Sequence, residues 1–251
     1  MSTDGDKIIL KQVGPSFGLP SASPFCLRLE AFLRLAALDY DVDNTPDPRK
    51  APKGKVPWIV DGGRELADTH FILEHLTRTR GLTVDVRLSA EQRAVAHACT
   101  RMLTENFYWV IVHSRWIYPD SWAPFRRDFL RLMPPVIGPL LVPMIRRGMR
   151  KAMHQHGMGR HSHDEIAAIA RGDIEALDAL LGARDYFFSA GPDDGPTSFD
   201  ATVYAFIASL LVPPFDTPQR RVLIEHARLT AHAARVHARL FPELPLPPVT
   251  R

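Results

Sequence analysis

Hydrophobic and polar residues follow two different spacings in the first eighty positions of the chain. In KIILKQV, residues 7–13, β-branched apolar residues alternate with other positions, which predicts a strand. The later segment PFCLRLEAFLRLAAL carries apolar side chains at helical spacing, at Phe25, Leu29, Phe32 and Ala36. The two segments therefore predict a strand followed by a helix.

The next stretch predicts a second strand, a hairpin and a second helix. DYDV is strand-like, and the charged stretch DNTPDPRKAPKGK leads to VPWIV, a DGG turn and RELAD, a pattern typical of a hairpin. THFILEHLTRTRG has helical spacing and ends at Gly81, a residue common just past a helix. The resulting order, β-α-β, a loop and β-β-α, resembles a thioredoxin-like domain with a right-handed crossover.

From Ser89 onward the pattern is helical. Ser89 and Gln92 predict a capping box before a helical pattern that runs to about Ile117, and Ser162 with Glu165 opens a later helix in the same way. TSFDATVYAFIASLL and QRRVLIEHARLTAHAARVHARLF also have helical spacing. We expect an α/β thioredoxin-like domain followed by an all-α domain, with boundaries at residues 1–81 and 89–245 and a linker at 82–88.

Composition narrows the classes of function. The chain has 251 residues, enough to bury a core, and its 31 basic and 28 acidic side chains give a net charge of +3, which argues against nucleic acid as a partner. Two cysteines and the absence of an apolar signal before KIILKQVG predict a reducing, cytoplasmic setting.

One apolar segment is long enough to be compared with a membrane-spanning helix. LMPPVIGPLLVPMI, residues 132–145, is shorter than the roughly 20 apolar residues of a spanning helix and contains four prolines. The basic run MIRRGMRKAMHQH after it could lie on an anionic membrane surface, or it could be a helix packed over a cleft. We favour the second interpretation and expect no membrane association.

Three places along the predicted α/β domain carry candidate chemistry. Val56-Pro57 opens a strand where a cis proline would let the Val56 backbone pair with an extended peptide, although an edge-strand proline would explain it too. Asp68 and Thr69 open a helix, where they could bind a ligand that carries a carboxylate and an ammonium or could simply cap the helix.

The third place is the start of the first helix, at SASPFCLRLE. Ser23 precedes a proline suited to the first helical position, so its hydroxyl could cap the helix or donate to a thiolate held there. Cys26 lies one turn inside, where most cysteines are buried. Cys26 as the working thiol of a reductase remains an alternative.

Together SPF, KVP and an acidic-plus-hydroxyl pair at a helix start resemble the glutathione transferase superfamily, and SPF is similar to its tau class. The resemblance implies glutathione as co-substrate, conjugated to a hydrophobic electrophile in detoxification, and a homodimer is left open. It implies that Ser23 stabilises the thiolate and that Asp68, one methylene shorter than the usual glutamate, holds the γ-glutamyl end. The implied glutathione-binding residues are Lys53, Lys55, Val56, Pro57, Asp68 and Thr69.

Other segments resemble one branch of that superfamily. SPFCLRLE, TENFYWVIVHSRW, GMGRHSHDEI and MPPVIGPLL are similar to the failed axon connections and metaxin-like branch. That resemblance leaves open a non-catalytic adaptor that keeps the fold. Thr197 and Asp200 in GPTSFDATVYA resemble the superfamily's capping box, which makes Asp200 a structural residue.

The long helical pattern before Ile117 is expected to border the cleft between the domains. Its polar and aromatic residues include Asn106, Tyr108, Trp109, His113, Arg115 and Trp116. Most of this stripe is expected to be core, and on helical spacing we select Met102, Asn106 and Trp109 as the electrophile side. Four histidines in HQHGMGRHSH lack a cysteine or carboxylate at ligand spacing, so we expect no metal.

Overall fold

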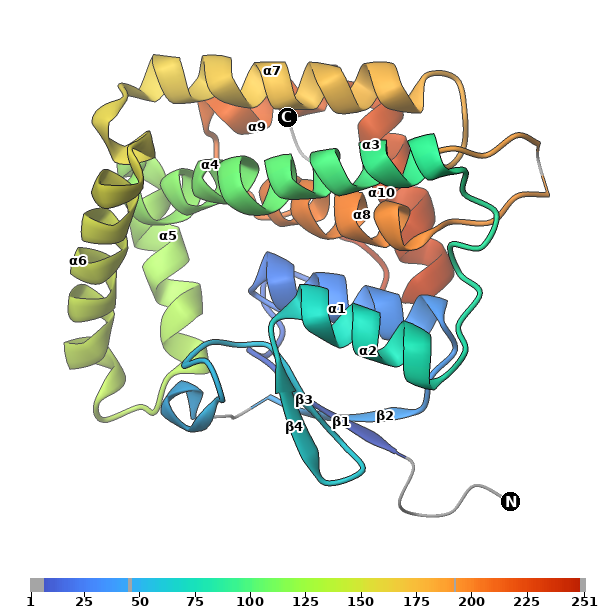
Figure 1. Ribbon diagram of the computed structural model, residues 1–251. Coiled ribbons are helices and arrows are strands. Elements are labelled where there is room, and N and C mark those ends of the chain that lie inside the picture. The colour runs from blue at the N-terminus through green and yellow to red at the C-terminus, as the bar shows by residue number, and fades with distance from the viewer. Residues whose placement is uncertain (1–6, 45–46, 192, 249–251) are drawn as a thin grey trace.

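The computed structural model describes residues 7–44, 47–191 and 193–248, and Figure 1 shows a small sheet below a larger set of helices. The strands are β1 (Ile8–Lys11), β2 (Tyr40–Asp43), β3 (Trp58–Asp61) and β4 (Arg64–Ala67). They lie in the order β2-β1-β3-β4, with β1 parallel to β2 and antiparallel to β3, and with β3 antiparallel to β4. This mixed sheet is the one that the element order predicts.

Two helices, α1 (Pro24–Leu35) and α2 (Thr69–Thr79), separate the sheet from the helical domain (Figure 1). The alternation predicted for β1 is present, because Ile8 and Leu10 are buried while Ile9 between them is exposed. Ile8 and Leu10 belong to an apolar core with Phe32 of α1 and Ile72 of α2. The small domain is therefore held by contacts between one face of its sheet and these two helices.

The remaining regular elements of the described chain are helices. In chain order they are η1 (Pro48–Lys50) in the first domain and then α3 (Ala90–Arg101), η2 (Met102–Phe107), α4 (Tyr108–Val112), η3 (His113–Ile117), α5 (Pro119–Phe129), η4 (Leu130–Leu132), α6 (Gly138–His156), η5 (Met158–Arg160), α7 (His163–Leu181), α8 (Ser198–Leu211), α9 (Pro218–Glu225) and α10 (Ala227–Leu240). Thirteen of the fourteen residues of α8 are buried, as is typical of a helix that other helices surround.

Predicted capping boxes form at the starts of three helices. At α8 the Asp200 carboxylate accepts hydrogen bonds from the backbone N–H and the hydroxyl of Thr197, both at 2.7 Å. Asp200 also accepts from the Phe187 N–H at 2.8 Å and contacts His232 at 2.9 Å, so it ties three segments together. The boxes at Ser89 and Ser162 form as well. These residues are structural, as expected.

Two helical patterns are less regular than their spacing predicts. The pattern up to Ile117 contains two π-helical segments, η2 and η3, in which hydrogen bonds join residues five apart instead of four. The pattern from 218 to 240 is interrupted at His226, whose ψ of 75° is not helical. His226 Nδ1 lies 3.5 Å from the Asp178 carboxylate, which Arg228 also pairs with, and this contact holds the break.

Candidate functional site

Ser23 lies at the N-terminal end of α1, in extended backbone with φ −101° and ψ 128°. Its hydroxyl oxygen accepts from the Cys26 N–H at 3.4 Å, and Pro24 occupies the first helical position. Ser23 is therefore the N-cap of α1. Its side chain is half-buried at the positive end of the helix dipole, a position that favours an anion.

Cys26 is fully buried beneath Ser23. Burial raises the pKa of the Cys26 thiol, and hydrogen bonds with the Val13 backbone and the hydroxyls of Ser23 and Ser21 offset this only in part. A thiol that is protonated and inaccessible cannot attack a disulfide or an electrophile. The geometry therefore argues against a reductase that uses Cys26.

The peptide bond between Val56 and Pro57 is cis, as the sequence predicts. Pro57 is buried and Val56 is half-buried immediately before β3. Trp58, the next residue, is 3% exposed, and its indole N–H has no partner among the described residues. A buried donor without a partner is rare, and a ligand oxygen or a water would satisfy it.

Asp68 is the N-cap of α2 and has an uncommon backbone for an aspartate, with φ 80° and ψ 117°. Its Oδ1 accepts from the His70 N–H at 3.0 Å, while the rest of the residue is exposed. Thr69 is buried. Of the two residues predicted to hold the γ-glutamyl end, Asp68 alone presents its polar group to solvent.

Lys53 and Lys55 are exposed in the loop before the cis proline. Lys53 Nζ lies 4.4 Å from the ring centre of Phe71, in the first turn of α2. Figure 1 shows that α1 and α2 both begin on the side of their domain that faces α5 and α6. The structure thus gathers the starts of two helices and a basic loop at one end of the small domain.

The helical domain contributes Arg115 and Tyr108 to this end. Arg115 is 6% exposed, and its guanidinium donates to the carbonyl oxygens of Ala22, next to Ser23, and of Ser209. Its Nε has no partner among the described residues, and burial lowers the pKa of Arg115 to about 10. The Tyr108 ring meets the Phe25 ring at 5.0 Å. A buried cation therefore adjoins Ser23.

The residues selected on helical spacing contact other parts of the molecule. Asn106 Nδ2 donates to the Asp173 carboxylate of α7 at 2.7 Å, Trp109 stacks on His156 at the end of α6, and Met102 packs at the border of the helical core. Burial raises the pKa of Asp173 to about 6. Met102 and Asn106 lie inside the π-helical segment η2 and Trp109 follows it, and their place in the electrophile site stays a prediction.

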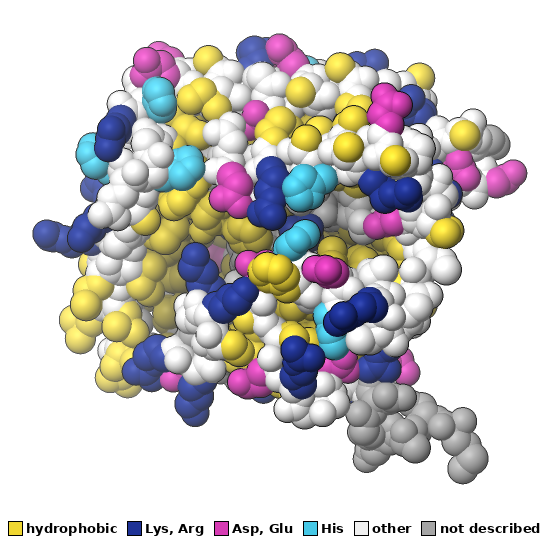
Figure 2. Space-filling view, in the orientation of Figure 1, with side chains coloured by type: hydrophobic (Ala, Val, Ile, Leu, Met, Phe, Trp, Pro, Cys, Tyr) yellow, Lys and Arg dark blue, Asp and Glu magenta, His cyan; other side chains and the backbone are white. Residues whose placement is uncertain are grey.

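Between α6 and the small domain the surface is hollowed, and hydrophobic side chains line the hollow (Figure 2). This hollow lies on the side where α1 and α2 begin (Figure 1). An apolar depression beside an anion-binding helix start is the arrangement that a hydrophobic electrophile and a thiolate require.

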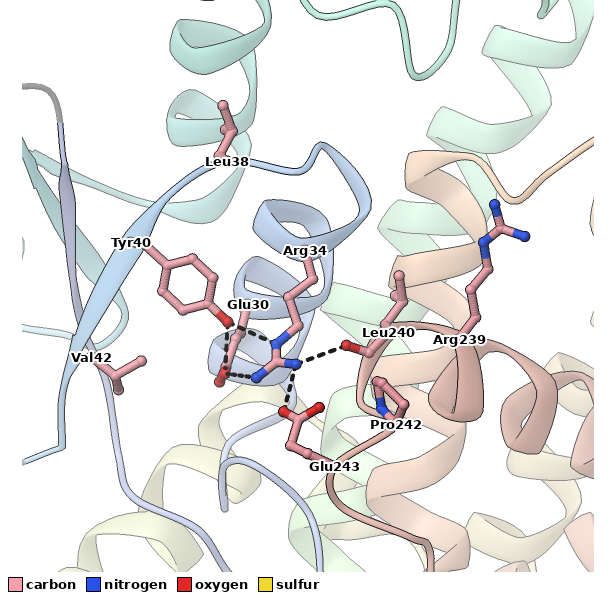
Figure 3. Close-up of a pocket in the computed structure, with 9 residues that line it drawn as sticks. All are labelled: Glu30, Arg34, Leu38, Tyr40, Val42, Arg239, Leu240, Pro242 and Glu243. Atoms are coloured by element: carbon pink, nitrogen blue, oxygen red, sulfur yellow. Dashed lines mark hydrogen bonds and ion pairs between the residues drawn. The ribbon is translucent and has the colours of Figure 1, made fainter. Parts of the chain in front are cut away.

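A separate cavity of about 600 Å³ lies at the other end of α1 (Figure 3). Its polar groups bind one another: Arg34 donates to the Tyr40 hydroxyl at 2.8 Å and pairs with Glu243 at 2.6 Å, and the Tyr40 hydroxyl donates to Glu30 at 3.1 Å. Arg34 also donates to the Leu240 carbonyl at 2.9 Å. This network joins α1 to the segment after α10.

The histidine-rich segment is dispersed in the structure. His156 stacks on Trp109, His161 lies 3.9 Å from Glu165, and His163 Nδ1 lies 2.7 Å from His113 Nε2. Over the described ranges no three side chains of His, Cys, Asp or Glu come together in a way that could hold a metal ion.

Family models match both parts of the chain. Residues 24–121 match the glutathione S-transferase N-terminal domain, and residues 170–236 match the glutathione S-transferase C-terminal domain. With the mixed sheet and the helical domain described above, the chain belongs to the glutathione transferase superfamily.

Three curated relatives illustrate the range of this superfamily. The chain is 30% identical to "Failed axon connections" of Drosophila melanogaster, in an alignment that covers 95% of this chain. It is 26% identical to metaxin-1 of Homo sapiens, with 90% of this chain covered. It spans 59% and 49% of those two proteins. It is also 27% identical to an isoprene-epoxide glutathione S-transferase of Rhodococcus sp. (strain AD45), over 80% of this chain and 85% of that enzyme.

Solved structures agree on the fold. A glutathione transferase family member from Pseudomonas fluorescens, with two glutathione bound, has a TM-score of 0.61 at 15% identity and covers 98% of this chain and 96% of that chain. A glutathione S-transferase from Methylobacterium radiotolerans, in complex with glutathione sulfonate, has a TM-score of 0.59 at 15% identity, with 98% of both chains covered.

Proposed function

We propose that the protein binds glutathione at the starts of α1 and α2 and adds its thiolate to a hydrophobic electrophile held in the neighbouring hollow. The observation that carries the proposal is the half-buried Ser23 hydroxyl at the start of α1, with the buried Arg115 guanidinium bound to the preceding carbonyl. Both features favour a negative charge at this point.

Each part of glutathione has a candidate partner. The Ser23 hydroxyl donates a hydrogen bond to the thiolate, and the Val56 backbone before the cis Pro57 pairs with the cysteinyl residue. Asp68 accepts from the γ-glutamyl ammonium at the start of α2, where the backbone N–H of Thr69, in the first helical turn, donates to the carboxylate. Lys53 and Lys55, both exposed, bind the glycyl carboxylate.

The energy required of these groups is modest. Lowering a thiol pKa from about 9 to below 7 is worth roughly 3 kcal/mol. A charge-assisted hydrogen bond contributes about 1.5–3 kcal/mol and a helix end about 0.3–1 kcal/mol. The hydroxyl of Ser23 and the start of α1 supply most of this energy, and the buried Arg115 guanidinium, which donates to two backbone carbonyls, adds a positive charge.

A small epoxide is the first electrophile to test, because the Rhodococcus relative is named for isoprene epoxide. The epoxide carbon would be attacked by the thiolate, the C–O bond would break, and the alkoxide formed would take a proton from water. Tyr108 is half-buried, its ring contacts that of Phe25, and its hydroxyl is a candidate to accompany this step. A cytoplasmic, detoxifying role remains part of this proposal.

The experiment is a calorimetric titration of glutathione into the wild type, Ser23→Ala and Ser23→Asp. Aspartate also caps helices well, so Ser23→Asp keeps α1 stable while its charge repels a thiolate. Ser89→Ala removes an equivalent cap on α3, at a distance from the site, and is the control. Weaker binding in both Ser23 variants, with Ser89→Ala unchanged, supports the proposal.

The second candidate is a non-catalytic adaptor, which the similarity to the metaxins favours. An adaptor has no need of a glutathione site. Absence of glutathione binding at millimolar concentration, a free energy weaker than about −4 kcal/mol, would favour the adaptor and exclude the transferase.

A further inference from the structure

Exposed hydrophobic side chains are concentrated in one short segment. Eight large hydrophobic residues are exposed among the described positions, and four of them lie within residues 136–144. Val136 is 85% exposed, Leu140 73%, Met144 69% and Ile137 48%. Apolar side chains grouped in this way on a surface mark a place where something binds.

The segment leads into and forms the start of α6, at the edge of the molecule. Three of the nineteen residues of α6 are buried, and Figure 1 shows α6 at the edge of the structure, away from the sheet. Figure 2 shows hydrophobic side chains at the end of α6 where it begins, with basic side chains nearby. The first turns of α6 therefore expose an apolar tip.

Basic residues continue the apolar stripe along the same face of α6. Ile137, Leu140, Met144, Arg147 and Lys151 are spaced three and four residues apart, which places them within an arc of about 80° on a helix of 3.6 residues per turn. Apart from Ile137, which is 48% exposed, each of these side chains is largely exposed. From Leu140 to Arg147 the helix rises about 10 Å, the depth over which a bilayer changes from acyl chains to headgroups.

Charge is concentrated in the same region. Residues 126–151 carry seven basic side chains and one acidic side chain, a net charge of +6, whereas the whole chain carries +3. The rest of the chain is therefore net negative by three. Exposed basic residues flank the apolar tip on α5, on η4 and on α6, at Arg126, Arg127, Arg131, Arg147, Arg150 and Lys151.

We propose that this face docks the protein on an anionic lipid bilayer, with the tip of α6 in the acyl-chain boundary and Arg147 and Lys151 on lipid phosphates. Clustered basic side chains beside exposed apolar ones are the features that bind such surfaces. A second copy of the chain fits poorly, because a two-fold contact would place this positive region against itself. The helices of the described ranges are too short or too polar to cross a bilayer, so the contact is peripheral.

Docking on a bilayer does not depend on the proposed glutathione chemistry. It reverses the expectation of no membrane association. Spacing alone could not show that Val136, Ile137, Leu140 and Met144 are exposed. The apolar stripe would equally suit a helix buried over the cleft, and the structure leaves it exposed.

The test is sedimentation of the full chain with vesicles of phosphatidylcholine alone and of phosphatidylcholine with phosphatidylglycerol. Leu140→Ser combined with Met144→Ser removes the apolar contact, and Arg147→Glu combined with Lys151→Glu reverses the charge. Val86→Ser, at a valine that is 75% exposed outside α6, and Arg78→Glu, at an exposed position of α2, are the controls for an apolar loss and a charge reversal elsewhere on the surface. Circular dichroism checks that each variant is folded.

We expect binding to the anionic vesicles that each α6 variant weakens by at least about tenfold and that the controls retain. Raising the salt from 0.1 to 1 M should also weaken it, because the screening length falls from about 10 to about 3 Å. Failure to sediment with anionic vesicles would overturn the inference. A dimer in ultracentrifugation that Leu140→Ser and Met144→Ser abolish, without vesicle binding, would assign the face to a second copy instead.

Discussion

The two ends of α1 show how differently similar residue types can be used. At the C-terminal end a cavity of about 600 Å³ is lined by Arg34, Tyr40, Glu30 and Glu243, which satisfy one another. At the N-terminal end Ser23 stands beside a buried Arg115 whose Nε lacks a partner among the described residues. We take the N-terminal end as the proposed binding end because of these groups, and not because of the size of a cavity.

Removing charge at the start of α2 should give the largest effect at the binding end. Asp68→Asn keeps a capping side chain that tolerates a positive φ but loses the charge that pairs with the γ-glutamyl ammonium. We expect glutathione affinity to fall about 10- to 100-fold, as for loss of a charge-assisted hydrogen bond. Calorimetry measures it, and Glu243→Gln at the other end of α1 is the control; equal losses in both variants would break the comparison.

Replacing Arg115 tests what the helical domain contributes at the N-terminal end of α1. Arg115→Met removes a buried positive charge beside Ser23, so the pKa of bound glutathione thiol should rise by about one unit, while Arg115→Lys should fall between wild type and Arg115→Met. Thiolate absorbance across pH measures the shift. A thermal melt separates this effect from the loss of the hydrogen bonds to Ala22 and Ser209. An unchanged thiol pKa in folded Arg115→Met would restrict Arg115 to holding the backbone.

A substitution at the C-terminal end of α1 should lower stability and leave glutathione affinity unchanged. Arg34→Met leaves the buried Glu30 without its 3.7 Å partner and removes the pair with Glu243. Because Arg34 is partly exposed, the cost should be about 1 kcal/mol of unfolding free energy. Urea denaturation measures it, and glutathione affinity should not change. A large loss of affinity in this variant would show that the two ends are coupled.

A substitution at Asp173, which accepts a hydrogen bond from Asn106, tests whether this face of the long helix belongs to the proposed electrophile site. Burial raises the folded pKa of Asp173 to about 6, above its unfolded value, so the folded state favours the protonated form. Its ionisation lowers stability as the pH rises from about 4 through 6. Asp173→Asn should therefore stabilise the protein by about 0.5–1 kcal/mol at pH 7 and have no effect at pH 4.

Urea midpoints at the two pH values measure this difference. If Asn106 and Asp173 are structural, the KM for an epoxide should not change in the same variant. An altered KM would return Asn106 to the electrophile site.

The smallest effect is expected at Cys26. The buried thiol has a raised pKa, so Cys26→Ala should leave conjugation within about twofold of wild type, and iodoacetamide should modify the half-buried Cys99 first. Mass spectrometry of the labelled protein shows the order. Faster labelling of Cys26 would contradict the burial described here.

Local signals let the sequence predict much of the fold. Hairpin and capping signals gave β3, β4 and the box at Thr197 and Asp200, and a proline before a strand gave the cis bond after Val56. These features depend on residues close together in the chain, which is why a single sequence can reveal them.

Features that depend on distant packing could not be predicted in the same way. Nothing in the spacing of the long helix signals its π-helical segments, and spacing does not show that Arg115 lies next to Ser23. The contact between Arg115 and Ala22 joins residues 93 positions apart. The exposure of the start of α6 likewise depends on whether distant segments of the chain pack against it.

We propose above all that the start of α1 stabilises the thiolate of bound glutathione. The most direct measurement is the ultraviolet absorbance of glutathione thiolate across pH, bound to the wild type, to Ser23→Ala and to Ser23→Asp. We expect a bound thiol pKa below 7 in the wild type, against about 9 for the free thiol, and a higher value in both variants. A thiol pKa that stays near that of free glutathione in the wild type, or that does not respond to Ser23, would contradict it.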